Sequence, residues 1–196
     1  MKDVHTEDAG QFYYHVPWPV AVIAVRWEGK DNAMAAAWHA PISFDPPLYG
    51  VSISPKRHTY DLIDKAREFT ANFLPLGAAE AIAAVGGSTG RELDKFAEFD
   101  LGRDHPLVVG SPILSAAYAA YECVLHDART YGDHRWFVGR IVAVHYTSRL
   151  QAPDGTTDPQ AAEPSLYLGA EMYATVAGMT KRHLDRKVYG ARRKTG

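Results

Sequence analysis

The stretch 32–59, NAMAAAWHAPISFDPPLYGVSISPKRHT, joins an alanine-rich run, a proline-containing breaker and a basic turn. The run Asn32–Trp38 holds four alanines. Alanine has low β-propensity and is the best helix former, so these residues alone allow a short helical turn, a tight sheet contact or a strand with an uncovered surface. In the last case, the small side chains would let a flat ring approach backbone N–H and C=O groups.

The turn Ser52–Thr59, SISPKRHT, places two serine hydroxyls and two or three cations just before a predicted helix start. A helix start attracts anions through its unpaired N–H groups, and Arg57 can add a two-pronged hydrogen bond. The pattern is typical of a phosphate site. A charged surface turn in which Thr59 only caps the helix is the alternative, and the local pattern leaves both open.

Short strands dominate the rest of the chain. Pro19–Val25 is a continuous apolar run that predicts a buried strand, and the turn Glu28–Asn32 predicts a hairpin. Residues 69–73 alternate as in a half-buried strand. Further predicted strands are 33–39, 48–53, 116–126, 136–146 and 166–173; predicted helices begin at Thr59 and cover 78–85 and 92–99; residues 151–164 are expected to form a loop. Strands outnumber helices without regular alternation, so the expected fold is mainly β with a few α-helices, built as a closed antiparallel sheet.

Composition indicates one soluble folded domain, residues 1–196. Of the 196 residues 46% are hydrophobic and 22% charged, and the longest strongly apolar run, Pro19–Val25, is too short to span a membrane. The start Met1–Asp8 lacks a secretory pattern and Cys123 has no partner cysteine, so a cytoplasmic location is expected. The segment Lys181–Gly196 forms a basic tail, but no basic and aromatic stripe lies elsewhere, and nucleic acid is rejected as a partner.

Taken in order, these segments resemble the flavin reductase-like and flavoredoxin family. The match continues into the second half, where Gly132–His134 precedes Phe137–Val142. The resemblance implies a Greek-key split β-barrel, with a core of about residues 15–175, that forms a homodimer and binds FMN at or near the subunit interface. The segments that carry the likeness in the first half are 17–22, 32–35, 42–48, 51–54, 56–59 and 69–72.

The resemblance also implies a set of cofactor-binding residues. One group would line the isoalloxazine ring, a second would reach the ribityl chain or phosphate, and a third would hold the phosphate. These are, in turn, Asn32, Ala33, Met34, Ala35, Ala36 and Ala37; Ser52, Ile53 and Ser54; and Arg57 and Thr59. Asn72 matches a family asparagine that either contacts flavin or supports the barrel, and Ser88 and Lys95 fall in the loop and helix that cover the flavin in relatives.

His134 is the candidate catalytic residue, because the matching family position lies where nicotinamide meets flavin. No GxGxxG or P-loop is present, so NADH or NADPH is expected to bind only transiently. The nine histidines show no HExxH or Cys-His ligand spacing, and no metal site is expected. The expected function is therefore an FMN-dependent oxidoreductase that transfers a hydride from NAD(P)H to FMN and passes electrons to an unknown acceptor.

Two alternatives remain from the sequence. One is a flavoredoxin-type electron-transfer protein without its own NAD(P)H activity. The other is a split-barrel binding protein that has lost flavin, because Ala35–Ala37 stand where relatives often have Thr, Val or Ser.

Overall fold

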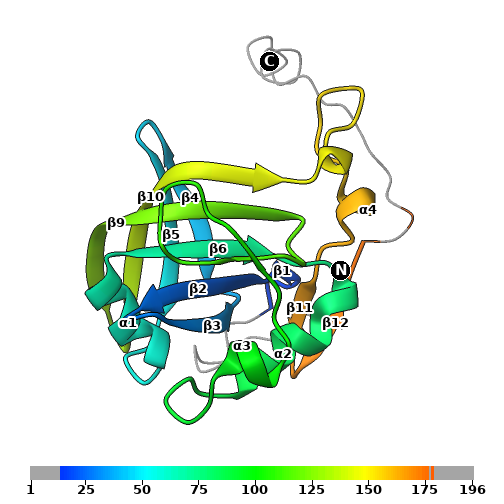
Figure 1. The fold of residues 1–196 in the computed structure, drawn as a ribbon. Helices are drawn as coiled ribbons and strands as arrows, with labels where there is room; N and C mark the ends of the chain where they lie inside the picture. Colours follow the sequence, from blue (N-terminus) through cyan, green and yellow to red (C-terminus); the bar gives the residue numbers. More distant parts are fainter. Residues whose placement is uncertain (1–13, 177, 179–196) are drawn as a thin grey trace, which may run out of the picture.

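The computed structural model describes residues 14–176 and 178, and its central feature is a seven-stranded antiparallel sheet (Figure 1). The N-terminal segment Met1–Asp8, predicted to lack a secretory signal, and the basic tail Lys181–Gly196 both lie outside the described residues. Along the sheet the strand order is β3-β2-β6-β9-β10-β5-β4. The bounds are β2 Ala21–Trp27, β3 Lys30–Ala36, β4 His39–Phe44, β5 Pro47–Ile53, β6 Glu68–Phe73, β9 Ala119–Tyr131 and β10 His134–Tyr146.

The sheet curls into a barrel, and its strand order shows where it closes. β3 and β4 lie at opposite edges of the order although only Ala37 and Trp38 separate them along the chain. A short connection between the two edges requires the sheet to bend round on itself. The backbone N–H of Ser52 donates to the Trp38 carbonyl at 2.9 Å, which ties β5 to this connection. The fold is thus mainly β and barrel-like, as predicted, with a seam at residues 37–38.

Helices and small sheets cover the barrel. α1 (His58–Ala66) packs on β2, while α2 (Ala79–Gly87) and α3 (Lys95–Glu98) pack on β3 (Figure 1). The remaining elements are β1 Trp18–Pro19, β11 Leu166–Gly169 and β12 Met172–Ala174, which form one sheet; β7 Arg103–Asp104 and β8 Ile113–Leu114, which form another; and η1 Leu76–Ala78, η2 Ser148–Leu150 and α4 Pro159–Ala162. Among the described residues, no helix combines the length and apolar character required to cross a membrane.

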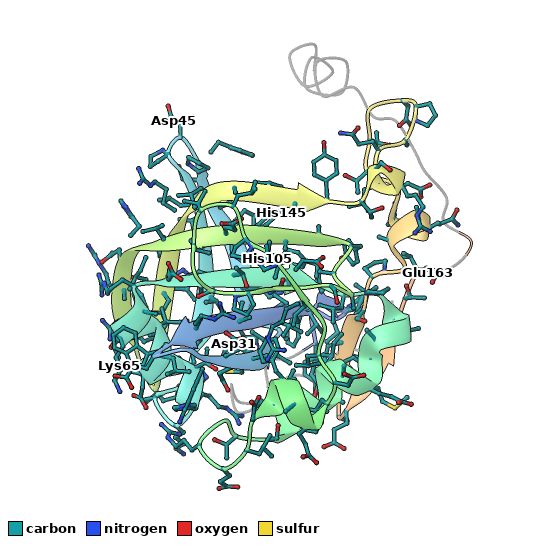
Figure 2. All side chains as sticks on the ribbon, viewed as in Figure 1. Asp31, Asp45, Lys65, His105, His145 and Glu163 are labelled. Atoms are coloured by element: carbon teal, nitrogen blue, oxygen red, sulfur yellow. The ribbon has the colours of Figure 1, made fainter. Side chains whose placement is uncertain are left out.

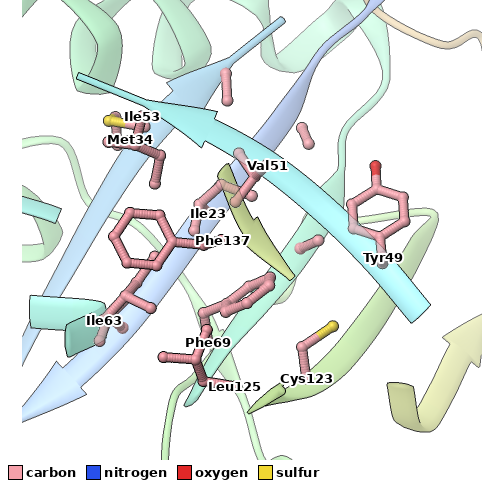
Figure 3. Packing of buried hydrophobic residues seen from close by; sticks show 14 of the residues in the cluster. Ile23, Met34, Tyr49, Val51, Ile53, Ile63, Phe69, Cys123, Leu125 and Phe137 are labelled. Carbon is pink, nitrogen blue, oxygen red and sulfur yellow. The ribbon is translucent and has the colours of Figure 1, made fainter. Parts of the chain in front are cut away.

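Two hydrophobic clusters explain why β2 is a continuous apolar run. Ile23 and Val25 point into the barrel, where Phe69 and Phe137 are fully buried (Figure 3). Val22 and Ala24 point the other way, into a second cluster beneath α2 and α3. A strand buried on both faces carries apolar residues at every position. The barrel wall that supports β3 is therefore rigidly packed.

For residues 69–73 the sequence correctly predicts a strand, but its prediction that only one face of the strand is buried was wrong. The strand exists, but both of its faces are buried, because Thr70 and Asn72 also face a covered layer. Their polar groups are satisfied there: the Thr70 hydroxyl donates to the Pro112 carbonyl at 2.6 Å. The final strand is also divided, since a turn with positive φ at Ala170 and Glu171 separates β11 from β12. Strand β4 was not predicted as a separate element, and the helix predicted for 92–99 is confined to Lys95–Glu98.

Candidate functional site

A cavity of about 480 Å³ opens at the seam of the barrel. The end of β3 forms one wall, the end of β5 and the basic turn form another, and the β9–β10 hairpin contributes the third. Its lining residues are Met34, Ala35, Ala36, Ala37, Trp38, Ser52, Ser54, Lys56, Arg57 and His134. Eight of these ten are site residues predicted from the sequence, and the fold brings them together from segments up to one hundred residues apart.

A second cavity of about 760 Å³ adjoins the first. Both contain Ala35, Ala36, Ala37 and Arg57 in their walls, so the two cavities lie side by side along the alanine run, and we refer to them together as the groove. The outer wall of the second part comes from α2, from the β11–β12 hairpin and from Val20 between β1 and β2; the residues of α2 and the hairpin are Ala83, Gly86, Gly87, Tyr167, Glu171 and Tyr173. The Tyr167 and Tyr173 rings lie 5.4 Å apart and present an aromatic edge to it.

The structure gives a physical reason for the alanines. Residues 30–36 form β3, so the helical alternative was wrong. Ala33 is fully buried against the helices, and a Cβ placed on Gly86 would come within 3.3 Å of the Ala35 Cβ. Larger side chains would push α2 away from the strand at these positions. At Ala36 and Ala37 the small side chains instead leave space in the groove.

Positive charge gathers at one end of this groove. Lys56 and Arg57 both line it, and Arg57 is the N-cap residue of α1 without making a side-chain cap hydrogen bond. The first N–H groups of a helix lack intrahelical partners and carry a partial positive charge. Together with the hydroxyls of Ser52 and Ser54, this end has the donors that a phosphate group requires.

Thr59 does not cap α1, so the alternative interpretation of Ser52–Thr59, a surface turn in which Thr59 only caps the helix, was wrong on this point. It lies inside α1, is 1% exposed, and its hydroxyl accepts a hydrogen bond from the Asn32 Nδ2 at 2.8 Å. Thr59 and Asn32 therefore join α1 to β3 from within. Neither residue lines the groove; Asn32 lines a separate cavity beside α1.

His134 stands at the mouth of the groove with a defined orientation. Its Nδ1 donates to the Asp133 carboxylate at 2.8 Å, and the ring lies 5.1 Å from the Trp38 ring. The hydrogen bond from His134 lowers the pKa of Asp133, and Lys56 contributes in the same direction. Because Asp133 occupies Nδ1, Nε2 is the His134 nitrogen that remains for a ligand.

Several predicted site residues lie behind the groove wall. Ile53 is a core residue, and Ala33 is fully buried, with its carbonyl accepting a hydrogen bond from Lys95. The Ser88 hydroxyl donates to the Ala84 carbonyl at 2.7 Å and finishes α2. Lys95 is 3% exposed and donates to the Ala33 and Val85 carbonyls.

Asn72 has a structural environment. Its Nδ2 donates to the Val22 carbonyl at 3.0 Å and to the Thr70 hydroxyl at 2.9 Å, and its Oδ1 accepts from the Leu114 N–H at 2.9 Å. With no exposed surface, it lies on the face of β6 that turns away from the barrel core, in the layer covered by β8, rather than in the groove. Of the two roles considered for Asn72, a flavin contact or support of the barrel, these hydrogen bonds favour support of the barrel.

Sequence reasoning missed the outer wall of the second part of the groove. Tyr167, Glu171 and Tyr173 lie far along the chain from the alanine run, and no local motif marks them. Gly86 and Gly87 had a signal, since paired glycines allow close approach of a ligand or a backbone, but the pattern did not show what they approach. Within residues 14–176 and 178, no group of three or more His, Cys, Asp or Glu side chains is arranged to hold a metal ion.

Comparison with known proteins gives consistent matches. The flavin reductase like domain family matches residues 13–175. An uncharacterized protein of Pyrococcus abyssi is 36% identical over 144 residues, which are 72% of this chain and 81% of that protein. A flavoredoxin of Methanosarcina acetivorans shares the fold, with a TM-score of 0.82 at 22% identity over 96% of this chain and all of that chain.

A solved structure of an FMN-binding protein from Thermus thermophilus is more similar in sequence. It is 38% identical, with a TM-score of 0.82 over 93% of this chain and 100% of that chain, and it holds bound 1-cyclohex-2-enone. The family match covers most of the chain, and the structural matches share its split barrel. This chain belongs to the flavin reductase-like family.

Proposed function

We propose that the protein binds FMN in the groove along Ala35–Ala37 and acts as an oxidoreductase. The observation that carries the proposal is the joining of a small-residue strand edge to a cationic, hydroxyl-rich helix start in one groove. Its two parts, of about 480 and 760 Å³, fall within the usual size of small-molecule sites, roughly 300–1,000 Å³. The donor set therefore fits a flat ring joined to a phosphate.

Each part of the groove has a role in this proposal. Ala35, Ala36 and Ala37 let the ring approach the strand backbone, while Ser52 and Ser54 face the polar chain between ring and phosphate. Arg57, Lys56 and the start of α1 hold the phosphate by charge and hydrogen bonds. When bound, FMN supplies the hydride and electron chemistry, taking a hydride from NADH or NADPH and passing electrons to an acceptor.

His134 is proposed to hold the reacting partner. The Asp133 hydrogen bond fixes the ring, and Trp38 supplies an adjacent aromatic surface on which a planar group can rest. His134 Nε2 is then placed to hydrogen-bond that group or to deliver a proton to it. In the same proposal the protein forms a homodimer, for which the exposed apolar side chains of Ile42, Phe44, Val144 and Tyr146 on β4 and β10 are suited.

A small carbonyl compound is a second candidate for the reacting partner. Structures of the related Thermus thermophilus protein contain 1-cyclohex-2-enone and p-hydroxybenzaldehyde, both planar carbonyl compounds. The Trp38–His134 pair offers this chain a ring contact and, when both ring nitrogens of His134 carry a proton, a hydrogen-bond donor for such a molecule. A flavoredoxin-type role, with electrons delivered by another reductase, is a further proposal that the fold also supports.

Anaerobic spectroscopy separates these proposals. The purified protein is loaded with FMN, and the flavin absorbance is followed after addition of NADH, NADPH or a reduced partner reductase. Bleaching by a nicotinamide supports the reductase function, and reoxidation by an enone supports the second candidate. Bleaching only by the partner reductase would favour electron transfer alone, and a protein that never takes up FMN would contradict all three.

A further inference from the structure

The outer wall of the second part of the groove carries two tyrosines that the proposed flavin contacts do not use. Tyr167 on β11 and Tyr173 on β12 are paired directly across the hairpin. Their ring centroids lie 5.4 Å apart, with the ring planes inclined by 54°. Both side chains are half-buried and line the cavity of about 760 Å³. The face of an aromatic ring carries partial negative charge, so the pair offers a surface that attracts a cation.

A carboxylate stands beside the two rings. Glu171, in the turn between β11 and β12, is the only acid among the described residues that line the groove. Its backbone N–H donates to the Tyr167 hydroxyl at 3.3 Å. Burial, followed by electrostatic repulsion from Tyr167 and Glu171, raises the pKa of Tyr173, as expected for a phenol close to a carboxylate. The hairpin thus holds one negative charge and two aromatic faces around the same space.

The turn that carries Glu171 has a backbone conformation that favours glycine. Its two central residues, Ala170 and Glu171, have φ values of 46° and 61°. Two-residue hairpin turns with positive φ at both central positions prefer Asn, Asp or Gly, because a Cβ atom is crowded in this conformation. Backbone strain of this kind clusters at functional sites. A side chain kept where glycine would relieve strain indicates a role for the Glu171 carboxylate.

Opposite charges of the groove come from different walls. Arg57, at the start of α1, lines both parts, whereas Glu171 comes from the hairpin on the outer wall of the second part. None of the ion pairs formed among the described residues joins the two. The other lining residues of the second part, apart from the two tyrosines, are small and uncharged: Val20, Ala35, Ala36, Ala37, Ala83, Gly86 and Gly87. They leave room for a flat group that the charges orient, with a positive end toward the hairpin.

We propose that Tyr167, Glu171 and Tyr173 form a subsite for a flat organic cation of the pyridinium type. The carboxylate supplies the attracting charge, and the rings cover the ligand with aromatic surface. A cation whose charge is spread over a plane is weakly hydrated, so it leaves water more readily than an ammonium group does. The inference goes beyond the proposed function and rests on it only in treating the cation as part of the molecule that reacts with flavin.

Calorimetric titration of the flavin-free, full-length protein tests the proposal. The probes are 4-carbamoyl-1-methylpyridinium and 4-methylbenzamide, which have the same shape and differ by one positive charge on the ring. Wild type is compared with Glu171→Gln, which keeps the shape of the side chain, and with Tyr173→Leu, which removes one ring. FMN is titrated into wild type in a separate experiment.

Wild type is expected to bind the pyridinium probe about tenfold more tightly than the neutral probe, because a carboxylate and two ring faces act on its charge. Glu171→Gln and Tyr173→Leu should each lose most of this preference. The affinity of Glu171→Gln for 4-methylbenzamide should stay that of wild type, because this probe carries no charge for the carboxylate to attract.

Glycine in the turn separates ligand binding from folding. Glu171→Gly should raise the melting temperature, because glycine adopts positive φ without strain, and should lose the preference for the charged probe. Glu163→Gly is the matched control, since Glu163 is an exposed acid with a φ of 45° at the end of α4 and lines neither part of the groove (Figure 2). The control should also gain stability but keep the preference.

Equal affinity of wild type for the two probes would overturn the inference, as would a Glu171→Gln protein that keeps the preference. A Glu171→Gly protein that is less stable than wild type and still prefers the charged probe would assign Glu171 to the fold alone. If FMN binds but the two probes are not distinguished, the proposed function stands without the cation subsite. If the pyridinium probe is preferred but FMN does not bind, the proposed function fails and the subsite stands.

Discussion

Replacing Arg57 by alanine tests the phosphate end of the groove with little risk to the fold. The backbone N–H of Arg57 donates to the Ser54 carbonyl and its own carbonyl accepts from Tyr60, and alanine keeps both bonds. The side chain makes no cap hydrogen bond to α1. The variant is therefore expected to melt within a few degrees of wild type, so a change in flavin affinity can be assigned to the site.

The expected loss follows from the chemistry of the side chain. A hydrogen bond between charged partners contributes roughly 1.5–3 kcal/mol, and screening at an exposed residue such as Arg57 reduces the lower end to about 1 kcal/mol. At about 1.4 kcal/mol per factor of ten, this range corresponds to FMN affinity weaker by about 5- to 150-fold. Riboflavin affinity should stay the same, because riboflavin has no phosphate.

Fluorescence titration and calorimetry measure both affinities, and Arg129→Ala serves as the matched control. Arg129 is an arginine on β9 that is 73% exposed, pairs with Asp127 and lines neither part of the groove. An Arg57→Ala protein that binds FMN as tightly as wild type would refute the assignment of this end to phosphate. An equal loss for riboflavin would show that Arg57 acts on the ring or on the fold instead.

Three further predictions concern reactivity and stability. His134→Ala should keep FMN affinity but slow reduction by NAD(P)H at least tenfold in stopped-flow absorbance, and an unchanged rate would remove its role. Asn72→Ala should lower the free energy of unfolding by about 2–4 kcal/mol in urea, because it leaves buried groups unpaired, and a loss below 0.5 kcal/mol would contradict its structural role. For Glu122, burial raises the pKa but hydrogen bonds from Leu107, Val109, His145 and Val108 outweigh it, so the net shift is downward. A carboxyl group whose pKa is lowered by folding stabilises the protein at pH values above its unfolded pKa, near 4.3, and this stabilisation is lost as the pH falls through its folded pKa. Glu122→Gln should therefore lower the free energy of unfolding by about 1–3 kcal/mol at pH 7 and match wild type in acid. A difference in the free energy of unfolding that stays constant with pH would contradict this interpretation.

The sequence predicts those parts of the fold that depend on neighbours along the chain. The buried strand predicted for Pro19–Val25, which the structure has as β2 from Ala21 to Trp27, and the long hairpin formed by β9 and β10 follow from apolar runs and turn residues. β4 was missed because an exposed edge strand lacks a clear apolar alternation, and Phe44 at its end is fully exposed. The bend at Ala170 and Glu171 was missed because, although Gly169 before them also has a positive φ, the two residues that complete the turn are not glycine.

The same limit applies to the site. The alanine run and Arg57 were found because their composition is unusual for a strand and a turn. Thr59, Asn72 and Lys95 were assigned to the cofactor from the resemblance, whereas their contacts depend on which buried polar groups meet in three dimensions. Tyr167 and Tyr173 reach the groove only through the pairing of β11 with β1, a long-range contact without a local signal.

Addition of FMN to the purified, flavin-free protein tests the central claim most directly. A ligand that binds only the native state raises the melting temperature, and at 100 times its Kd it adds about 2.7 kcal/mol of stability. We predict saturable binding near one FMN per chain, a changed visible flavin spectrum and a melting temperature that rises with FMN concentration. An unchanged spectrum and melting temperature at millimolar FMN would contradict the assignment of the groove along Ala35–Ala37 as a flavin site.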